Sequence, residues 1–323
     1  MKNVKIVAAV AAAFALAAFV LVGCSSGGSA SSAASSASAS ASSASATSAS
    51  ASAASASAAS ASASAASASA SAASASAAAS DASSGSISKL VVGFDQEYPP
   101  YGFVGSDGQF TGFDLELAQE VCKRNGWEYV AQPINWDTKL EELNAGAFDC
   151  IWNGFTMEGR EGDYAFSDPY MDNGQVVLVK NDSGIQQLSD LAGKVVATQT
   201  DSAAEEVLTQ GGAQAQLAAT FQALETRDTY AIAMTELEAG AFDALACDLS
   251  IAAFYMADKP DTYRVLNDYL SQEHYAVAFR TADTDLAKTV TATLKEMVSD
   301  GTVEALCQKY AEYGISFDNW VLK

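Results

Sequence analysis

Arg160 and Asp248 are the residues of this sequence whose charge and position are best suited to chemistry. The chain has five arginines, and only Arg160 follows a predicted strand end and a Gly-x-Thr turn, formed by residues 154–156. A guanidinium suits a carboxylate bidentately, and Thr156 with nearby backbone N–H groups could complete that shell. Asp248 ends a second predicted strand and could receive an ammonium group. Because a buried charge without a partner costs several kcal/mol, these opposite charges predict a site for a small zwitterion.

Aromatic and polar side chains near these charges predict the rest of that site. Tyr98 and Trp136 offer flat walls for an aliphatic or amide group, and Asp95 is available to a polar tip. Ser202 would cap the helix that follows it and present backbone N–H groups to an anion.

Each of these residues also has an ordinary structural interpretation. Arg160 could form a surface ion pair with Glu158 or Asp163, and Asp248 could cap a strand end. The two aromatic residues could pack in a core without touching a ligand. The residues alone leave these alternatives open.

Two nearly identical segments indicate which elements position the two charges. Residues 142–149 read ELNAGAFD, residues 236–243 read ELEAGAFD, and each segment runs into an apolar stretch. In each copy the Leu and Ala residues fit a helix face, the Gly suits a left-handed helix cap, and the apolar stretch suits a buried strand. Open α/β sheets bind ligands beyond the carboxyl ends of their strands, so two such units predict a cleft between two lobes. The alternative is a common helix-to-strand sequence that recurs by chance.

Further signals place the remaining elements around these units. An apolar strand at residues 90–94 opens into the polar and aromatic loop 95–101. Asp107-Gly108 predicts a hairpin turn, and Gly112-Phe113-Asp114 starts a helix. Another helix opens at residues 135–137, and a strand at residues 193–198 leads toward Ser202.

Residues 1–88 predict export and tethering. Lys2 and Lys5 precede an apolar run from residue 6 to residue 22, as in a secretory signal. The Leu-Val-Gly-Cys sequence at residues 21–24 resembles a bacterial lipoprotein box, which implies a signal peptide at 1–23 and a lipid on Cys24. The competing interpretation is a single membrane-spanning anchor. Residues 24–88, almost wholly Ser and Ala, predict a disordered tether, and both interpretations leave the remainder outside the cytoplasm.

Charge, cysteine and histidine usage exclude several classes of function. With 39 acidic and 17 basic residues the formal net charge is −22, so nucleic acid and anionic membrane surfaces are poor partners. His274 is the single histidine, which excludes a histidine-based triad and a multi-histidine metal site. No metal and no cofactor are expected.

The cysteines other than Cys24 have neither metal-ligand nor redox spacing. Cys122, Cys150, Cys247 and Cys307 are expected to be buried thiols. Because an exported protein can hold disulfides, a bond between Cys122 and Cys150 remains the alternative.

A series of short motifs occurs in one order along residues 89–323. They are Asp95 to Tyr101 with its Tyr-Pro-Pro core, Gly112-Phe113-Asp114, Trp136, Gly154-x-Thr156 with Arg160, Phe166-Ser167-Asp168-Pro169-Tyr170, Asp190-Leu191-x-Gly193-Lys194, Asp248 and Asp300-Gly301-Thr302. In this order they closely resemble the polar amino-acid family (family 3) of bacterial extracellular solute-binding proteins, the receptors of amino-acid ABC transporters. The resemblance implies the type II periplasmic-binding-protein fold, with two α/β lobes joined by two hinge strands and a ligand cleft between them.

The resemblance also implies lobe boundaries and ligand-binding residues. Lobe 1 would comprise residues 89–170 and 275–323, lobe 2 residues 175–271, and the hinge residues 170–174 and 271–275. Ligand-binding roles would fall on Asp95, Tyr98, Trp136, Gly154, Thr156, Arg160, Gln199, Ser202, Ala203 and Asp248. Two departures from the family pattern bear on these roles. The segment between Gly154 and Arg160 is one residue shorter, and Asp201-Ser202-Ala203 stands where many members have Gly followed by two hydroxyl residues.

The expected function is that of a lipid-anchored receptor on the extracytoplasmic face of the bacterial cell membrane. It would bind a small polar amino acid, glutamine-like or basic, by lobe closure and deliver it to an ABC transporter permease. The protein is expected to be a monomer that touches the membrane only through its lipid, and not to be an enzyme. The alternatives are a cyclohexadienyl-dehydratase-like enzyme, which would need a general acid such as Glu97 or Glu273, and the ligand-sensing subunit of a signalling receptor.

Overall fold

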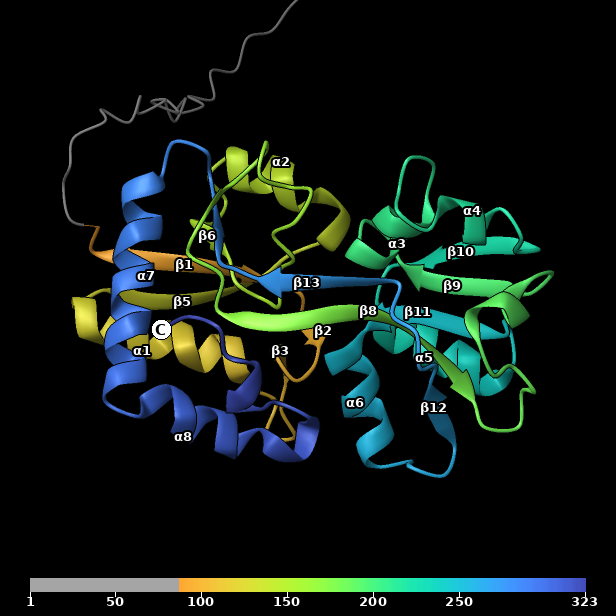
Figure 1. Cartoon of the computed structure of the whole chain (residues 1–323). Helices are drawn as coiled ribbons and strands as arrows, with labels where there is room; N and C mark the ends of the chain where they lie inside the picture. The colour runs from red at the N-terminus through yellow and green to blue at the C-terminus, as the bar shows by residue number, and fades with distance from the viewer. Residues whose placement is uncertain (1–86) are drawn as a thin grey trace, which may run out of the picture. The chain divides into compact units, whose positions relative to one another are not determined.

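Residues 87–323 are described by a computed structural model, and they form two α/β lobes (Figure 1). The predicted signal peptide, the lipid anchor at Cys24 and nearly all of the predicted tether lie outside the described residues. The fold is the type II periplasmic-binding-protein fold that the motif order implied.

The first lobe is built on a five-stranded sheet with the order β5-β1-β6-β14-β7. β5, β1 and β6 are parallel, whereas β14 runs antiparallel to β6 and β7. Helices α1 and α7 pack against each other and against this sheet. The strands are β1 (Lys89–Phe94), β5 (Glu128–Pro133), β6 (Cys150–Ile151), β7 (Ala165–Phe166) and β14 (Ala278–Phe279), and the helices are α1 (Phe113–Asn125), α2 (Lys139–Asn144), α7 (Thr284–Ser299) and α8 (Thr302–Lys309).

The second lobe repeats this plan. Its sheet has the order β10-β9-β11-β8-β12, with β10, β9 and β11 parallel and β8 antiparallel to β11 and β12. The strands are β8 (Met171–Lys180), β9 (Val195–Gln199), β10 (Ala223–Arg227), β11 (Ala244–Asp248), β12 (Tyr263–Val265) and β13 (Ser271–Tyr275), and the helices are α3 (Ala203–Leu208), α4 (Ala215–Ala218), α5 (Tyr230–Ala239) and α6 (Leu249–Ala257).

Two antiparallel strands connect the lobes. β8 and β13 lie side by side between the two halves of the molecule, with Met171 opposite Tyr275 and Gln175 opposite Ser271 (Figure 1). Of the predicted hinge segments, 170–174 begins one residue before β8 and continues into it, and 271–275 coincides with β13. The boundaries predicted for the lobes remain a prediction.

The two copies of the repeated segment form the same structure. Each forms a helix, α2 or α5, then a turn and a strand, β6 or β11, as predicted. The turn glycines, Gly146 and Gly240, have φ of 78° and 77°, a left-handed conformation that a side chain disfavours. The prediction of a repeated helix–turn–strand unit is confirmed.

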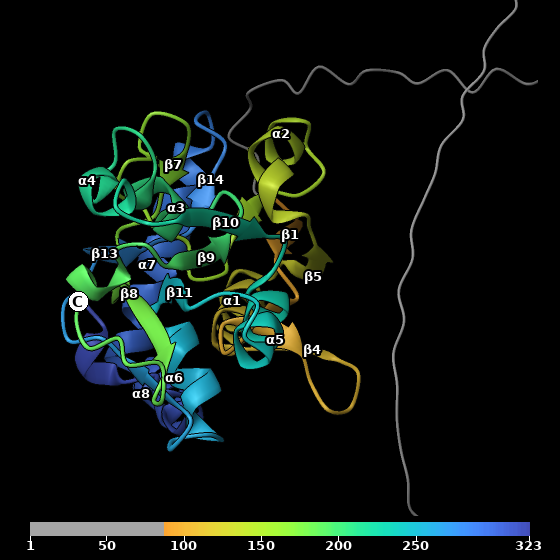
Figure 2. The same cartoon turned by 90° about the vertical axis from the view of Figure 1, so that its right-hand side faces the viewer.

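A third, small sheet stands beside the first lobe. It consists of β2 (Glu97–Tyr98), β3 (Gly102–Val104) and β4 (Phe110–Thr111), all antiparallel. The loop between β3 and β4 contains the predicted Asp107-Gly108 turn and projects from the body of the lobe (Figure 2). The other short elements are 3-10 helices: η1 (Trp136–Thr138), η2 (Leu188–Leu191), η3 (Ala311–Tyr313) and η4 (Phe317–Asn319).

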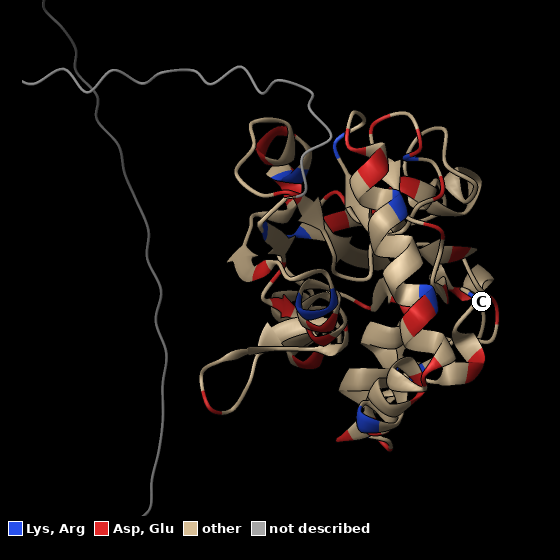
Figure 3. Ribbon diagram, turned by 90° about the vertical axis from the view of Figure 1, so that its left-hand side faces the viewer, with Lys and Arg blue, Asp and Glu red and all other residues tan. Residues whose placement is uncertain are grey.

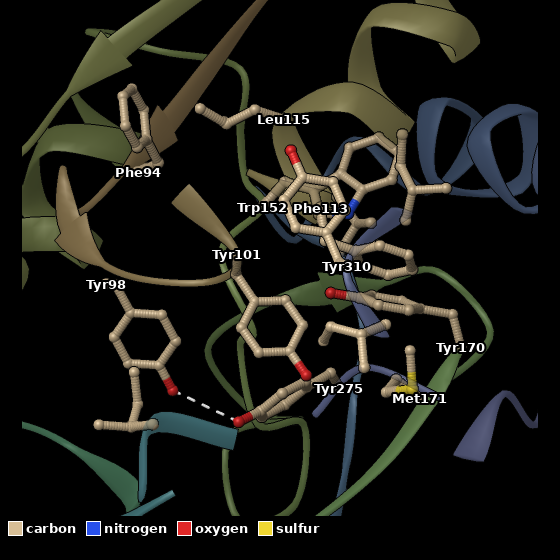
Figure 4. Close-up of a cluster of buried hydrophobic side chains, with 14 of the residues drawn as sticks. Phe94, Tyr98, Tyr101, Phe113, Leu115, Trp152, Tyr170, Met171, Tyr275 and Tyr310 are labelled. Carbon is tan, nitrogen blue, oxygen red and sulfur yellow. Dashed lines mark hydrogen bonds between the residues drawn. The ribbon is translucent and has the colours of Figure 1, made fainter. Parts of the chain in front are cut away.

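The core is rich in tyrosine where the lobes meet. Tyr98, Tyr101 and Tyr275 are buried together, and the hydroxyls of Tyr98 and Tyr275 share a hydrogen bond of 3.3 Å (Figure 4). The four cysteines are buried free thiols, as expected, and no disulfide joins any of the described residues. On the outer face of the first lobe, Asp and Glu are more prominent than Lys and Arg (Figure 3).

Candidate ligand-binding site

The carboxyl ends of four strands position the candidate site. Asp95 follows β1, Gly154 lies in the loop after β6, Gln199 ends β9 and Asp248 ends β11. Two of these strands belong to each lobe. Parallel strands of one sheet bring their carboxyl ends to the same edge, so each lobe presents its strand ends to the other.

Nine of the ten predicted ligand-binding residues line one pocket, and Asp95 lies behind it. The lining residues are Tyr98, Trp136, Gly154, Thr156, Arg160, Gln199, Ser202, Ala203, Tyr230 and Asp248. The volume of the pocket is about 10 Å³, which is about enough for one water molecule. An amino acid is many times larger, so the lobes or the lining side chains must move apart before one can enter.

Arg160 is held at the edge of this pocket by contacts within its own loop. Its Nη1 donates to the backbone oxygen of Thr156 at 3.3 Å, and its guanidinium lies 4.8 Å from the ring centre of Phe155. Its carboxylate neighbour is Glu206 of the second lobe, at 3.6 Å. The surface pair with Glu158 or Asp163 is therefore not formed in this structure.

Asp248 faces the pocket from the second lobe. Its Oδ1 accepts hydrogen bonds from Asn173, Gln175 and Tyr275, at 2.9, 2.7 and 2.8 Å. Although Asp248 precedes α6, its side chain makes no cap hydrogen bond to that helix. All three bonds fall on the same oxygen of the carboxylate.

Aromatic rings form the walls of the pocket. Tyr98 and Trp136 stack with an interplanar angle of 11° and centroids 6.3 Å apart, and Tyr230 lies 6.0 Å from Tyr98. Gly154 has a φ of 56°, and a Cβ there would meet Tyr98 and Tyr275 at about 3 Å. A side chain at this position would be strained by the backbone conformation and would crowd these rings.

Tyr230 is the lining residue that sequence reasoning missed. It begins α5, directly after Thr229, whose side chain caps this helix. Tyr230 stands six residues before the Glu that opens the second repeat, and Trp136 stands six residues before the Glu that opens the first. Extending the repeat toward the amino terminus would have identified it. Burial raises the pKa of Tyr230 well above its usual range, and the nearby Asp248 raises it further.

The carboxylate of Asp201, which follows β9, is directed to a lysine of the first lobe. Lys139 is buried, and its ammonium contacts the Asp201 carboxylate and donates to the Trp136 carbonyl. Burial and, secondarily, Arg160 lower the pKa of Lys139 to about 8. The backbone of Asp201 has a φ of 54°, a left-handed conformation that is uncommon for residues other than Gly.

Ser202 caps α3 as predicted. Its Oγ accepts a hydrogen bond from the backbone N–H of Glu205 at 3.1 Å and shares another with Thr198. Ser202 and Ala203 both line the pocket at the start of this helix. Backbone N–H groups at a helix start are suited to an anion.

The carboxylates that a dehydratase would need lie outside the pocket. Burial and the neighbouring Asp248 raise the pKa of Glu273 well above its usual range. Its Oε1, however, accepts from Asn173 and Gln175, and Glu273 lines a separate hollow beside the hinge strands. Glu97, on β2, does not line the pocket either.

Neither a metal centre nor a membrane-spanning helix is found within residues 87–323. This part of the chain contains no group of three or more His, Cys, Asp or Glu side chains arranged to hold a metal ion. None of its helices combines the length and apolar character needed to cross a bilayer.

Two lobes that enclose a pocket lined by one arginine and one aspartate define a solute-binding protein. The sequence pattern of the bacterial extracellular solute-binding proteins, family 3, matches residues 90–313, and the chain belongs to this family. The resemblance deduced from the motifs is thereby confirmed.

Individual relatives agree with this assignment. The chain is 34% identical to the L-cystine-binding protein TcyJ of Escherichia coli over 68% of its own length and 82% of that protein's. It is 31% identical to the arginine-binding extracellular protein ArtP of Bacillus subtilis over 69% and 86%. It also superposes on a histidine-bound substrate-binding protein of an ABC uptake transporter from Streptococcus pneumoniae, with a TM-score of 0.66, 30% identity and coverage of 71% and 95%. These relatives are binding proteins, and the expectation that the chain is not an enzyme is confirmed.

Proposed function

We propose that this protein captures a free amino acid between its lobes and delivers it to the permease of an ABC transporter. The observation that carries the proposal is one pocket lined by Arg160 from the first lobe and Asp248 from the second. These opposite charges match the carboxylate and the ammonium of an amino acid. Relatives named for cystine and arginine, and one with bound histidine, support an amino acid as the ligand class.

Each of the nine predicted residues that line the pocket has a role in the proposed complex. Arg160, Thr156 and the N–H groups of Ser202 and Ala203 bind the carboxylate, and Asp248 binds the ammonium. Tyr98 and Trp136 flank the side chain of the ligand, Gly154 leaves room beside it, and Gln199 with Asp95 behind it meets its tip. The lobes, residues 89–170 with 275–323 and residues 175–271, close by bending at 170–174 and 271–275.

The ligand is a glutamine-like or basic amino acid. Asp95 is buried and is bonded to Gln199, which lines the pocket. In the proposed complex Asp95 lies near the tip of the ligand's side chain, where it would repel an acidic ligand, and an aliphatic ligand would leave polar groups without partners.

A thermal-shift screen of the protein against the free amino acids tests the proposal. A ligand at one hundred times its dissociation constant should stabilise the protein by about 2.7 kcal/mol, a rise of several degrees in the melting temperature. Arg160→Ala should abolish the rise. Arg124→Ala is the matched control, because Arg124 pairs with Glu120 and Asp300 away from the pocket. If no amino acid shifts the melt, or if glutamate or leucine gives the largest shift, the proposed ligand class is wrong.

The proposed location is the extracytoplasmic face of the cell membrane, where a lipid on Cys24 holds a monomer by a tether of residues 24–88. Membrane contact through the lipid alone fits the acidic composition of the chain. Cys24→Ser should release the protein from the membrane fraction of expressing cells. A Cys24→Ser protein that stays with the membrane would contradict lipid anchoring and favour a spanning segment.

A further inference from the structure

A buried cluster at the hinge strands joins two carboxyl groups through the same two amides. Asn173 Nδ2 donates to Asp248 Oδ1 at 2.9 Å and to Glu273 Oε1 at 2.6 Å. Gln175 Nε2 donates to the same two oxygens, at 2.7 Å each. Asp248 and Glu273 are each 4% exposed. If both were ionised, two like charges would lie close together with little water around them.

The basic residues near this cluster are paired elsewhere. Arg160, on the loop after β6, pairs with Glu206. His274, on β13, contacts Glu158 and Asp172. Within residues 87–323, no lysine, arginine or histidine forms an ion pair with either carboxyl group of the cluster. Because two buried carboxylates without a cation cannot both ionise without a large cost in free energy, one of them keeps its proton.

The hydrogen bonds indicate that Glu273 is the group that keeps the proton. Asp248 Oδ1 accepts a third bond, from the Tyr275 hydroxyl at 2.8 Å. More donors favour the charged form of a carboxyl group, so Asp248 is the ionised member of the pair. Burial and the charge of Asp248 both raise the pKa of Glu273, in agreement with this order.

An ammonium group bound at Asp248 would supply the positive charge that the cluster lacks. We propose that Glu273 is the protonated partner of Asp248, and that it releases its proton to water when the ammonium of an amino acid binds. This proposal rests on the proposed function and adds an exchange to it: one positive charge enters the pocket and one proton leaves the protein. Glu273 does not line the pocket, so it acts on the ligand through Asp248 as a positioning residue.

The hollow beside the hinge strands gives this proton a separate route to water. Its volume is about 490 Å³, and Asn173, Glu273 and His274 are among the residues that line it. None of the residues that line this hollow lines the ligand pocket. The proton can therefore leave while the two lobes enclose the ligand.

The exchange makes amino-acid affinity depend on pH. The complex holds fewer protons than the free protein, so affinity rises with pH wherever Glu273 is protonated without ligand and ionised with it. One exchanged proton gives a rise of up to about tenfold for each pH unit. At higher pH Glu273 is ionised in both states, and the dependence ends.

Calorimetric titrations of the full-length chain with glutamine and with arginine test the proposal. Binding enthalpies measured in phosphate and in Tris buffer, from pH about 6 to about 8, give the number of protons released. We expect the native chain to release about half a proton or more at its maximum, and Glu273→Gln, which keeps the shape of the protonated acid, to release none. Glu273→Asp, which keeps an acid, should restore part of the release. Asp172→Asn is the matched control, because Asp172 lines the same hollow and contacts His274, and it should release as many protons as the native chain.

Two results would overturn the proposal: no proton release by the native chain across this range, or equal release by Glu273→Gln. Loss of the release in Asp172→Asn alone would assign the proton to Asp172 and His274, and would overturn it as well. The proton count of the native chain requires no variant, so the proposal can fail even if Glu273→Gln does not fold. A native chain that binds neither amino acid would instead count against the proposed function, so the two failures are distinguishable.

Discussion

The two copies of the repeated segment share one backbone plan but end in different chemistry. In the first copy, Asp149 accepts a hydrogen bond from Val91 N–H and returns one to the Val91 carbonyl; in the second, Asp243 does the same with Val195. Five residues after this aspartate the first copy has Gly154, whereas the second has Asp248. The repeated units thus place Gly154 and Asp248 at equivalent strand ends that line one pocket. The residue types at and after these strand ends determine the charge that each lobe contributes.

The two strand ends are also supported differently. Asp248 is a charged group held by neutral donors, among them Gln175 and Tyr275. Gly154 is a neutral group held by a buried carboxylate, because Asp114 Oδ2 accepts from Gly154 N–H at 2.6 Å and from the Tyr170 hydroxyl at 2.7 Å. The second lobe therefore presents the carboxylate of Asp248 to the pocket. The first lobe uses the carboxylate of Asp114 to hold its strand end, and it presents Arg160 from further along the loop.

Neutralising Asp248 should have the largest effect on binding. Asp248→Asn keeps an oxygen for the three donors that hold it and removes the charge proposed to meet the ammonium. Because truncating a buried charge pair costs about 2–5 kcal/mol, amino-acid affinity should fall about 100-fold in calorimetric titrations. Asp168→Asn, at a surface pair with Lys295, is the control. A loss smaller than tenfold would contradict the role assigned to Asp248.

Asp114, whose carboxylate holds the strand end at Gly154, should make the free energy of unfolding depend on pH. Burial raises the pKa of Asp114 from 3.8 to about 7. Between these values the native state binds more protons than the unfolded state, so the free energy of unfolding should fall as pH rises from about 4 to about 7 and then level off. The fall amounts to at most about 4 kcal/mol. Urea unfolding across this range should show a flatter profile for Asp114→Asn than for the native chain. Parallel profiles would contradict the assignment.

Substituting Asp149 and Asp243, the aspartates that end the two repeated segments, tests whether they stabilise their lobes equally. Asp149→Ala and Asp243→Ala each leave a strand N–H without its partner, which should cost about 1–3 kcal/mol in urea unfolding. Asp149→Ala should lower the free energy of unfolding more than Asp243→Ala. Asp149 also lies 3.3 Å from Arg280, whereas Asp243 lies 3.8 Å from the more exposed Lys194. A larger loss at Asp243 would reverse this ranking.

The smallest effect is expected at Tyr230, the second copy's counterpart of Trp136. Its buried hydroxyl has no hydrogen-bond partner in the described part of the chain, so Tyr230→Phe should change the free energy of unfolding by less than about 0.5 kcal/mol. Affinity for the amino acid should fall about threefold to tenfold if the ligand supplies the missing partner. Tyr263→Phe removes an equally unpartnered hydroxyl outside the pocket and should leave affinity unchanged. Equal affinities for the two variants would exclude Tyr230 from recognition.

Sequence reasoning predicted the repeat, its left-handed glycines and the Ser202 cap because each depends on residues close together along the chain. Helix periodicity, a positive φ and a cap bond are local properties, so the residue types reveal them. Nine of the ten predicted site residues line the pocket for a related reason: they follow strand ends or helix starts, whose positions the fold class implies.

The partners of these residues were decided by tertiary structure. Asp201 contacts Lys139 and Asp95 bonds to Gln199, although more than sixty residues separate the members of each pair along the chain. No local pattern relates such residues, because they meet only where elements of the two lobes come together. Composition and spacing determined that a positive charge follows the strand of one repeated unit and that a negative charge ends the strand of the other. Long-range packing decided which acids are buried behind the pocket and which donors their oxygens bind.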